Sequence, residues 1–269
     1  MSKILCLADI TDEAMFRTIT ISFILFFIVA VMHSKNMKPG YQRNLKILVF
    51  FKSVEYQHES VPEALNMMKE LAIQNKWIIK LTEDSVVFTS ENLHLYDVIV
   101  FLLTGGDILD DGGKEALKEY IHTGGGLVTI HTGPYTMQEW PWFNNLVGAC
   151  FIGHPPVQQG KLIIEDLTHP STGFLDDTVM LWTEEWYSFD RSPRSSAHVI
   201  MSVDENSYDV DDNRWFEGVI QRMGDHPVAW YHDNEGGRFF QTALGHEASA
   251  YQNEFMRKHI VGAILWAGN

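Results

Sequence analysis

The sequence predicts one α/β domain with three layers, in which a mainly parallel sheet lies between helices. Three observations carry this prediction. From Lys46 onward, short apolar runs alternate with amphipathic stretches, a pattern typical of βαβ units. The length of 269 residues suits a single α/β domain after a short N-terminal segment. A hydrophobic content of 45% and a charged content of 20% are those of a globular protein with a sizeable core.

The N-terminal segment, residues 1–34, is expected to be a signal peptide or an N-terminal anchor. Residues 19–32 are an uncharged apolar run, which is short for a membrane span of about 20 residues but suits the apolar part of a signal peptide. Acidic residues upstream do not suit a signal, so we expect translation to start at Met15, with cleavage after Ser34. Export to the periplasm or the medium follows, and a membrane anchor through residues 19–32 or a buried helix are the alternatives.

The first half of the domain follows the βαβ rhythm closely. Ser60 and Glu63 predict a capping box at the start of a helix that ends near Asn75. Residues 114–122 predict a second helix, which the glycines at 124–126 terminate. One expected strand is apolar on both faces, as a central parallel strand should be. The strands expected here are residues 46–51, 77–81, 97–103 and 127–130.

The second half of the domain predicts a change from a parallel to a mixed sheet, because the rhythm becomes looser. Aromatic-rich and His-Pro segments separate the candidate strands, and residues 204–212 form an acidic surface loop. Residues 255–266 supply a closing helix, so the domain spans residues 45–268. The strands expected here are residues 161–165, 198–203, 228–231 and 238–244.

The charge and the cysteines limit the classes of function. A formal net charge of −15 without a Lys/Arg run argues against nucleic acid as a partner, because its phosphates would be repelled. A small neutral or cationic molecule is the expected ligand, and the oligomeric state stays open. Cys6 and Cys150 predict no disulfide framework, and the apolar surroundings of Cys150 predict an inert thiol.

Histidines are the first candidates for chemistry. His131 ends the fourth strand at the carboxyl edge of the predicted parallel sheet, where open α/β sheets bind their ligands. His58 and His246 also come directly after expected strands, which favours them over an average histidine. Three further histidines lie next to proline and can converge on the same cleft, namely His154, His169 and His226.

Two carboxylates beside two aromatic residues are the second group of candidates, in the run Glu184-Glu185-Trp186-Tyr187. In a strand, Glu185 and Tyr187 would share one face while Glu184 points to the other. This arrangement suits a sugar, because the aromatic ring packs on the C–H face of the sugar. The carboxylate accepts hydrogen bonds from the sugar hydroxyls or acts as a general base. An amphipathic strand with Trp186 and Tyr187 in the core explains the run equally well.

Motifs for other chemistries are absent from the sequence. It contains no GxSxG nucleophile elbow, no GxGxxG run and no phosphate-binding loop. Neither HxH nor HExxH spacing occurs, so the His, Asp and Glu residues are only scattered candidates for metal ligands. A divalent metal ion is therefore the one cofactor that the sequence leaves open.

An ordered series of motifs resembles the trehalose-utilisation (ThuA-like) family over residues 45–268. Each motif is weak by itself, but the ordered set is specific. The motifs that carry the resemblance include His58-Glu59-Ser60, Gly124-Gly125-Gly126-Leu127-Val128-Thr129-Ile130-His131, Trp140-Pro141-Trp142-Phe143, His154-Pro155, Glu184-Glu185-Trp186-Tyr187, His226-Pro227 and Gly237-Arg238-Phe239-Phe240-Gln241 through Gly245-His246.

This resemblance implies a flavodoxin-like, class I glutamine amidotransferase-like fold. In the related amidotransferases the turn after the strand carries a nucleophilic Cys, and here that position corresponds to His131, so glutamine hydrolysis through a thioester is not expected. The resemblance also implies a role in the use of trehalose, related disaccharides and 3-keto sugars. The family often has Asp at the position of Glu184, which makes Glu185 the stronger candidate for chemistry.

These expectations combine into one hypothesis: an exported enzyme that acts on a disaccharide or 3-keto-glycoside by acid/base hydrolysis, elimination or isomerisation. The expected proton-transfer pair is His131 and Glu185, and His58, His154 and His246 would position hydroxyls or hold a divalent cation. The full expected catalytic set is His131, Glu185, His154 and His246. The expected substrate-binding set is His58, Tyr187, Glu184, His226 and Arg238. The alternative is a non-catalytic sugar-binding or scaffold protein on the same fold.

Overall fold

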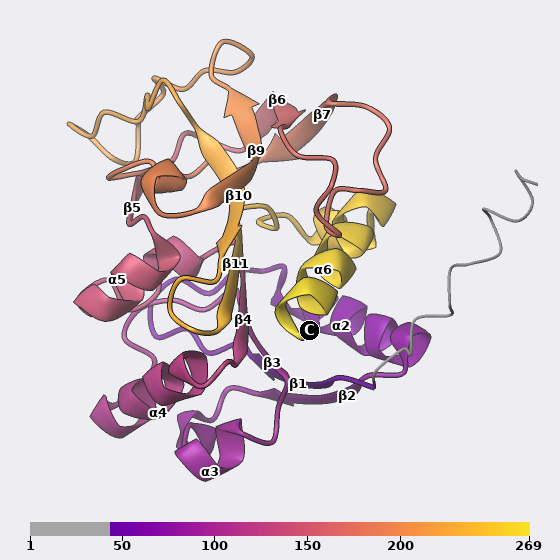
Figure 1. The fold of residues 1–269 in the computed structure, drawn as a ribbon. Coiled ribbons are helices and arrows are strands. Elements are labelled where there is room, and N and C mark those ends of the chain that lie inside the picture. Colours follow the sequence, from indigo (N-terminus) through magenta and orange to yellow (C-terminus); the bar gives the residue numbers. More distant parts are fainter. Residues whose placement is uncertain (1–43) are drawn as a thin grey trace, which may run out of the picture. The chain divides into compact units, whose positions relative to one another are not determined.

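The computed structural model describes residues 44–269, and its central feature is a nine-stranded sheet (Figure 1). The strands run across the sheet in the order β2-β1-β3-β4-β11-β10-β9-β6-β7. A second, two-stranded sheet pairs β5 (Phe151–Gly153) with β8 (Ser188–Phe189). The strands of the large sheet are β1 (Lys46–Phe50), β2 (Ile78–Thr82), β3 (Val98–Leu102), β4 (Gly126–Ile130), β6 (Gln158–Ile164), β7 (Val179–Glu184), β9 (His198–Asp204), β10 (Pro227–His232) and β11 (Arg238–Thr242).

The parallel part of the sheet consists of β2, β1, β3, β4 and β11. This is the strand order of a flavodoxin-like sheet. Strands β3 and β4 are buried along their whole length, which explains why both are uniformly apolar apart from Thr129. From β10 to β7 every pairing is antiparallel, so the predicted change to a mixed sheet is confirmed.

Helices cover both faces of the parallel part, as the three-layer prediction requires (Figure 1). Helices α2 (Val61–Asn75) and α6 (Glu254–Ala267) lie on one face, and their apolar sides supply Met68, Leu71 and Ile260 to the core. The other face carries α3 (Ser90–Leu93), α4 (Asp111–His122) and α5 (Pro141–Val147).

The start of helix α2 corrects one prediction. Ser60 precedes the helix as expected, but its side chain makes no capping hydrogen bond, so the predicted capping box with Glu63 is wrong. The backbone of Ser60 is helical, with φ −76° and ψ −8°, whereas a capping serine adopts an extended conformation that aims its hydroxyl at the next free N–H groups. The predicted end at Asn75 is confirmed, and Lys76 closes the helix in the left-handed conformation.

The second half of the domain departs from the predicted elements in several places. Strand β7 was not expected, and it ends at Glu184, so Glu185 and Tyr187 do not lie together in one strand. Strand β11 ends at Thr242 instead of continuing to residue 244. Within the predicted acidic surface loop, Glu205 is buried, because it accepts hydrogen bonds from the backbone N–H groups of Met223 and Gly224 at 2.6 and 2.9 Å.

The predicted signal or anchor segment, with its start at Met15 and its apolar run at 19–32, lies outside the described residues. Within residues 44–269, no helix combines the length and the apolar character that a membrane span requires.

Candidate functional site

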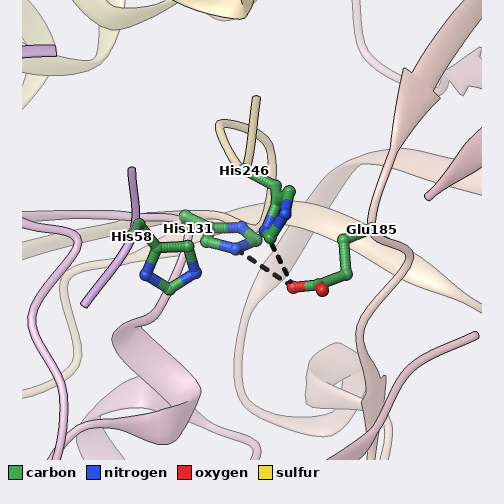
Figure 2. A group of neighbouring side chains, drawn as sticks. All are labelled: His58, His131, Glu185 and His246. Atoms are coloured by element: carbon green, nitrogen blue, oxygen red, sulfur yellow. Dashed lines mark ion pairs between the residues drawn. The ribbon is translucent and has the colours of Figure 1, made fainter. Parts of the chain in front are cut away.

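Three of the predicted histidines meet at the carboxyl edge of the parallel strands. His58 lies in the loop after β1, His131 directly follows β4, and His246 comes shortly after β11. The ring centroids of His58 and His131 are 4.8 Å apart, and those of His58 and His246 are 5.2 Å apart. The rings of His131 and His246 are separated by 5.5 Å. Because parallel strands end at one edge, three loops far apart in the sequence form a single cluster (Figure 2).

Glu185 joins these histidines from the segment after β7, and its two oxygens together reach three histidines. Oε2 lies 3.0 Å from Nδ1 of His246 and 3.6 Å from Nε2 of His131, the two contacts drawn in Figure 2. Oε1 lies 3.1 Å from Nδ1 of His154. The side chain is only 8% exposed. Glu185 is therefore the common neighbour of three imidazole rings.

The ionisation of the cluster follows from burial and from these contacts. Burial opposes the charged form of Glu185, but His131, His246 and His154 favour it more strongly and hold the pKa of the carboxyl well below its usual range. Burial and the neighbouring rings of His131 and His246 lower the pKa of His58 far below its ordinary value. For His246 burial acts in the same direction, yet the contact with Glu185 raises the pKa overall.

The backbone at His131 fixes the direction of its ring. The residue has φ 67°, a left-handed conformation that is uncommon outside glycine and is often found at functional sites. Its N–H donates to the Thr242 carbonyl at 2.7 Å, and its ring Nδ1 donates to the Ala243 carbonyl at 2.8 Å. Since a carbonyl only accepts, Nδ1 carries a hydrogen, and Nε2 is the ring atom that faces Glu185.

Glu184 holds the neighbouring turns together instead of lining the cleft. Its buried carboxylate accepts hydrogen bonds from the backbone N–H groups of Gly245, His246 and Glu185 at 2.7, 3.0 and 3.0 Å. A fourth comes from the indole N–H of Trp182 at 3.2 Å. The expectation that Glu184 contacts substrate is not met, but its four donors fix both Glu185 and His246.

His226 supports the same segment from the other side. Its Nε2 lies 2.8 Å from the carbonyl of Tyr187, and its Nδ1 lies 2.9 Å from Oε1 of the buried Glu205. The expectation that His226 binds substrate directly is not met, because its ring is enclosed behind Tyr187. The ring of Tyr187 packs at 4.5 Å from that of His131 and faces the cavity.

A cavity of about 410 Å³ opens above the cluster. Its floor is polar and its walls are mainly aromatic. His131 does not reach the cavity, because it lies behind Glu185 and Tyr187. The lining residues are Tyr56, His58, Tyr135, Phe151, His154, Val157, Glu185, Tyr187, Trp215, Phe216 and His246.

His154 is held in one orientation at the side of this cavity. Its Nδ1 donates to the Pro155 carbonyl at 3.0 Å and lies 3.1 Å from Glu185 Oε1. Both neighbours are acceptors, so Nδ1 carries the hydrogen and Nε2 is the basic nitrogen. Burial lowers the pKa of His154, and Glu185 opposes that effect only in part. The ring stacks beside Tyr187, with centroids 5.7 Å apart.

Two sequence candidates lie away from the cavity. Arg238 begins β11, at the end of the strand opposite to His246, where it donates to the Trp266 carbonyl at 2.6 Å and packs over the Trp266 ring. The expectation that Arg238 binds substrate is therefore not met. His169 is buried against Tyr231 and Phe240.

The aromatic walls of the cavity were missed by the sequence analysis. Phe151 stands three residues before His154, and its ring lies 4.4 Å from that of Tyr187, so proximity to the Gly-His-Pro motif was the available signal. Trp215 and Phe216 come from a loop that follows the acidic run and pack against His154 with ring centroids 5.6 and 4.8 Å away. No local pattern in the sequence indicates that this loop returns to the site.

The single cysteine of the described residues is not part of the cavity wall. Cys150 precedes β5, and burial raises the pKa of its thiol. A nucleophile needs the opposite shift and a place beside the substrate. Cys150 does not take the place of an amidotransferase nucleophile, and the strained turn after β4 carries His131 instead.

Residues 44–269 thus form a three-layer α/β domain with a flavodoxin-like parallel sheet, in which the left-handed turn after β4 carries His131. Residues 46–267 match the model of the family described as "ThuA: Trehalose utilisation", so the chain belongs to that family. No curated protein matches the sequence significantly.

Solved structures with the same fold include two ThuA-like proteins. The structure from Bacteroides uniformis ATCC 8492 has a TM-score of 0.70 at 21% identity, covering 86% of this chain and 94% of that one. The structure from Parabacteroides merdae ATCC 43184 has a TM-score of 0.66 at 17% identity, covering 84% and 91%. A β-galactosidase from Bacillus circulans sp. alkalophilus has a TM-score of 0.51 at 13% identity, and the match covers 84% of this chain but 31% of that enzyme.

Proposed function

We propose that the protein is a carbohydrate-processing enzyme that moves a proton at the carbon next to a sugar carbonyl, as in elimination from or isomerisation of a 3-keto-glycoside. The observation that carries this proposal is the Glu185 carboxylate, which contacts three histidines at the floor of an aromatic-walled cavity. Membership of the ThuA family supports a role in carbohydrate use.

The cavity suits a sugar in size and in character. Its volume of about 410 Å³ lies in the range of small-molecule sites, which is roughly 300–1,000 Å³. Tyr56, Phe151 and Trp215 offer ring surfaces for the C–H faces of a pyranose, and the polar floor offers partners for oxygen atoms. These features also suit a protein that binds sugar without converting it, so binding alone does not establish catalysis.

The number of carboxylates favours keto-sugar chemistry over ordinary glycoside hydrolysis. Common glycosidases place two carboxyl groups on either side of the bond that breaks. Among the cavity-lining residues of the described chain, Glu185 alone is acidic, and the carboxylate of Glu184 is occupied by four N–H donors. A carbonyl acidifies the neighbouring C–H, so one base and one electrophilic partner for the carbonyl oxygen suffice.

The geometry suggests a division of roles. The basic Nε2 of His154 takes the proton, while Glu185 and the Pro155 carbonyl hold its ring. In an elimination, the electrons of the C2–H bond form the C1=C2 double bond, the C1–O bond breaks, and the departing oxygen receives a proton. His131 does not line the cavity, so we assign it to positioning Glu185 and replace the expected His131–Glu185 pair by His154 and Glu185.

The test is turnover of a keto-sugar by the purified full chain. We expect conversion of 3-keto-trehalose, followed by nuclear magnetic resonance, and no conversion of trehalose. His154→Gln and Glu185→Gln should each lower the rate by about 100-fold or more, the usual contribution of an acid/base group. If neither sugar is converted, with or without added divalent metals, the proposal that the protein is an enzyme of this kind is refuted. Tight sugar binding in that case would instead support the non-catalytic alternative.

A further inference from the structure

Four neighbouring side chains, three of which line the cavity, are arranged as ligands of one ion. One ligand-type atom from each of His58, His131, His246 and Glu185 can be chosen so that all four lie within 4.8 Å of one another. Four ligands arranged tetrahedrally about 2.1 Å from a single ion are about 3.4 Å apart. An ion therefore fits after the side chains move inward by less than about 1 Å.

Four nitrogen atoms of this cluster lack hydrogen-bond partners of their own. Both ring nitrogens of His58, Nε2 of His131 and Nδ1 of His246 are buried without a hydrogen bond. His131 is fully buried and His58 is 5% exposed. The 3.0 Å approach of His246 Nδ1 to Glu185 does not have hydrogen-bond geometry. Each buried polar atom left unpaired costs about 1–3 kcal/mol, so several such atoms around one carboxylate indicate a missing partner.

The surroundings fix these side chains as a metal site requires. The Ala243 carbonyl binds Nδ1–H of His131 at 2.8 Å and leaves the lone pair of Nε2 free for a ligand bond. The carboxylate of Glu184 holds the backbone N–H groups of Glu185 and His246 at 3.0 Å each. These contacts preset the direction of three of the four ligands before an ion binds.

The donor set selects the class of ion. Three imidazoles and one carboxylate suit first-row divalent transition metals, whereas Mg²⁺ and Ca²⁺ prefer oxygen ligands and soft ions prefer thiolates. We infer that His58, His131, His246 and Glu185 bind one divalent transition-metal ion such as Zn²⁺, Fe²⁺ or Co²⁺ at the floor of the cavity.

The position of this metal centre deepens the proposed function, on which its catalytic role rests. His58, His246 and Glu185 line the cavity, so the ion would face a bound sugar and polarise its carbonyl oxygen. Glu185 would bind the ion through Oε2, which faces His131 and His246, while Oε1 keeps its contact with His154. His154 stays outside the metal centre as the proton acceptor.

The inference is tested by metal binding to the full chain, without any sugar. After removal of metals with a chelator, calorimetric titration with Zn²⁺ should give one site per chain, and Co²⁺ should produce the absorption bands of nitrogen ligation. Binding should also raise the Tm, because it stabilises only the folded state. Glu185→Gln and His246→Gln should weaken binding by at least about 100-fold, since even residues that only orient ligands contribute about 10–100-fold.

The matched control is His232→Gln, which changes a buried histidine whose Nε2 donates to the Leu146 carbonyl at 2.6 Å, outside the metal centre. It should bind the ion as the unaltered chain does. Absence of a stoichiometric site in the folded unaltered chain, or equal affinity in His232→Gln, Glu185→Gln and His246→Gln, would overturn the inference. Metal binding without turnover would refute the proposed function alone, and full turnover by a chain that binds no metal would refute the metal centre alone.

Discussion

The replacement Glu184→Gln tests whether Glu184 holds the site together. The two oxygens of the carboxylate each accept two N–H donors: Oε1 from Glu185 and His246, and Oε2 from Trp182 and Gly245. A glutamine amide replaces one oxygen by NH₂, so two donors lose their acceptor. Hydrogen bonds to a charged group contribute about 1.5–3 kcal/mol each, so the loss of two should lower the free energy of unfolding by about 3 kcal/mol or more.

The expected shift in Tm follows from this loss. For a domain of 150–250 residues, 1 kcal/mol corresponds to about 2–4 °C, so Glu184→Gln should melt roughly 6–12 °C lower. Scanning calorimetry measures the difference, and Glu247→Gln is the matched control, because Glu247 is a neighbouring exposed carboxylate whose change should shift stability by about 0.5 kcal/mol or less. A decrease in Tm of at least ~6 °C is expected for Glu184→Gln. A Tm within about 2 °C of that of the control would therefore show that the four contacts do not stabilise the fold.

Three further predictions concern residues around the site and in the core. Burial lowers the pKa of His259 to about 4, so below pH 6.5 the unfolded chain binds a proton that the folded chain excludes, and stability should fall between pH 6.5 and 4 by at most about 3 kcal/mol. Urea unfolding at several pH values measures this slope, which should shrink in His259→Gln. Trp215→Ala should weaken keto-sugar binding about 3–10-fold by calorimetry with an unchanged Tm, because Trp215 is 58% exposed at the cavity. Cys150→Ser should leave turnover of the keto-sugar unchanged, because burial raises the pKa of the thiol. A loss of turnover in this variant would show that the thiol takes part in the reaction.

The parallel half of the fold could be predicted because β1, β3 and β4 are short, mainly apolar runs between helix signals. Strand β3 is buried at every position, so it needs no alternation to be recognised. Strand β7 could not be predicted in this way. Its apolar Val179 and Leu181 are exposed, whereas the charged Glu184 is buried, so polar and apolar residues do not alternate along the strand. Only the four N–H donors around Glu184 explain why a carboxylate occupies an inward position.

The site was predictable where it depends on the ends of parallel strands. His58, His131 and His246 follow strands that the sequence identifies, so their approach to one edge follows from topology. The sequence does not show that His58 and His246 line the cavity whereas His131 does not, because this difference depends on the left-handed turn at His131. Arg238 was wrongly expected to bind substrate, because a family motif does not specify which end of a strand faces the ligand.

The central claim is that His154, held by Glu185, moves a proton next to a sugar carbonyl. The most direct measurement is exchange of the C2 hydrogen of 3-keto-trehalose for deuterium in D₂O, followed by nuclear magnetic resonance. We expect the chain to accelerate this exchange and His154→Gln to slow it by about 100-fold or more. Exchange no faster than in buffer, or exchange undiminished in His154→Gln, would contradict the proposed proton transfer.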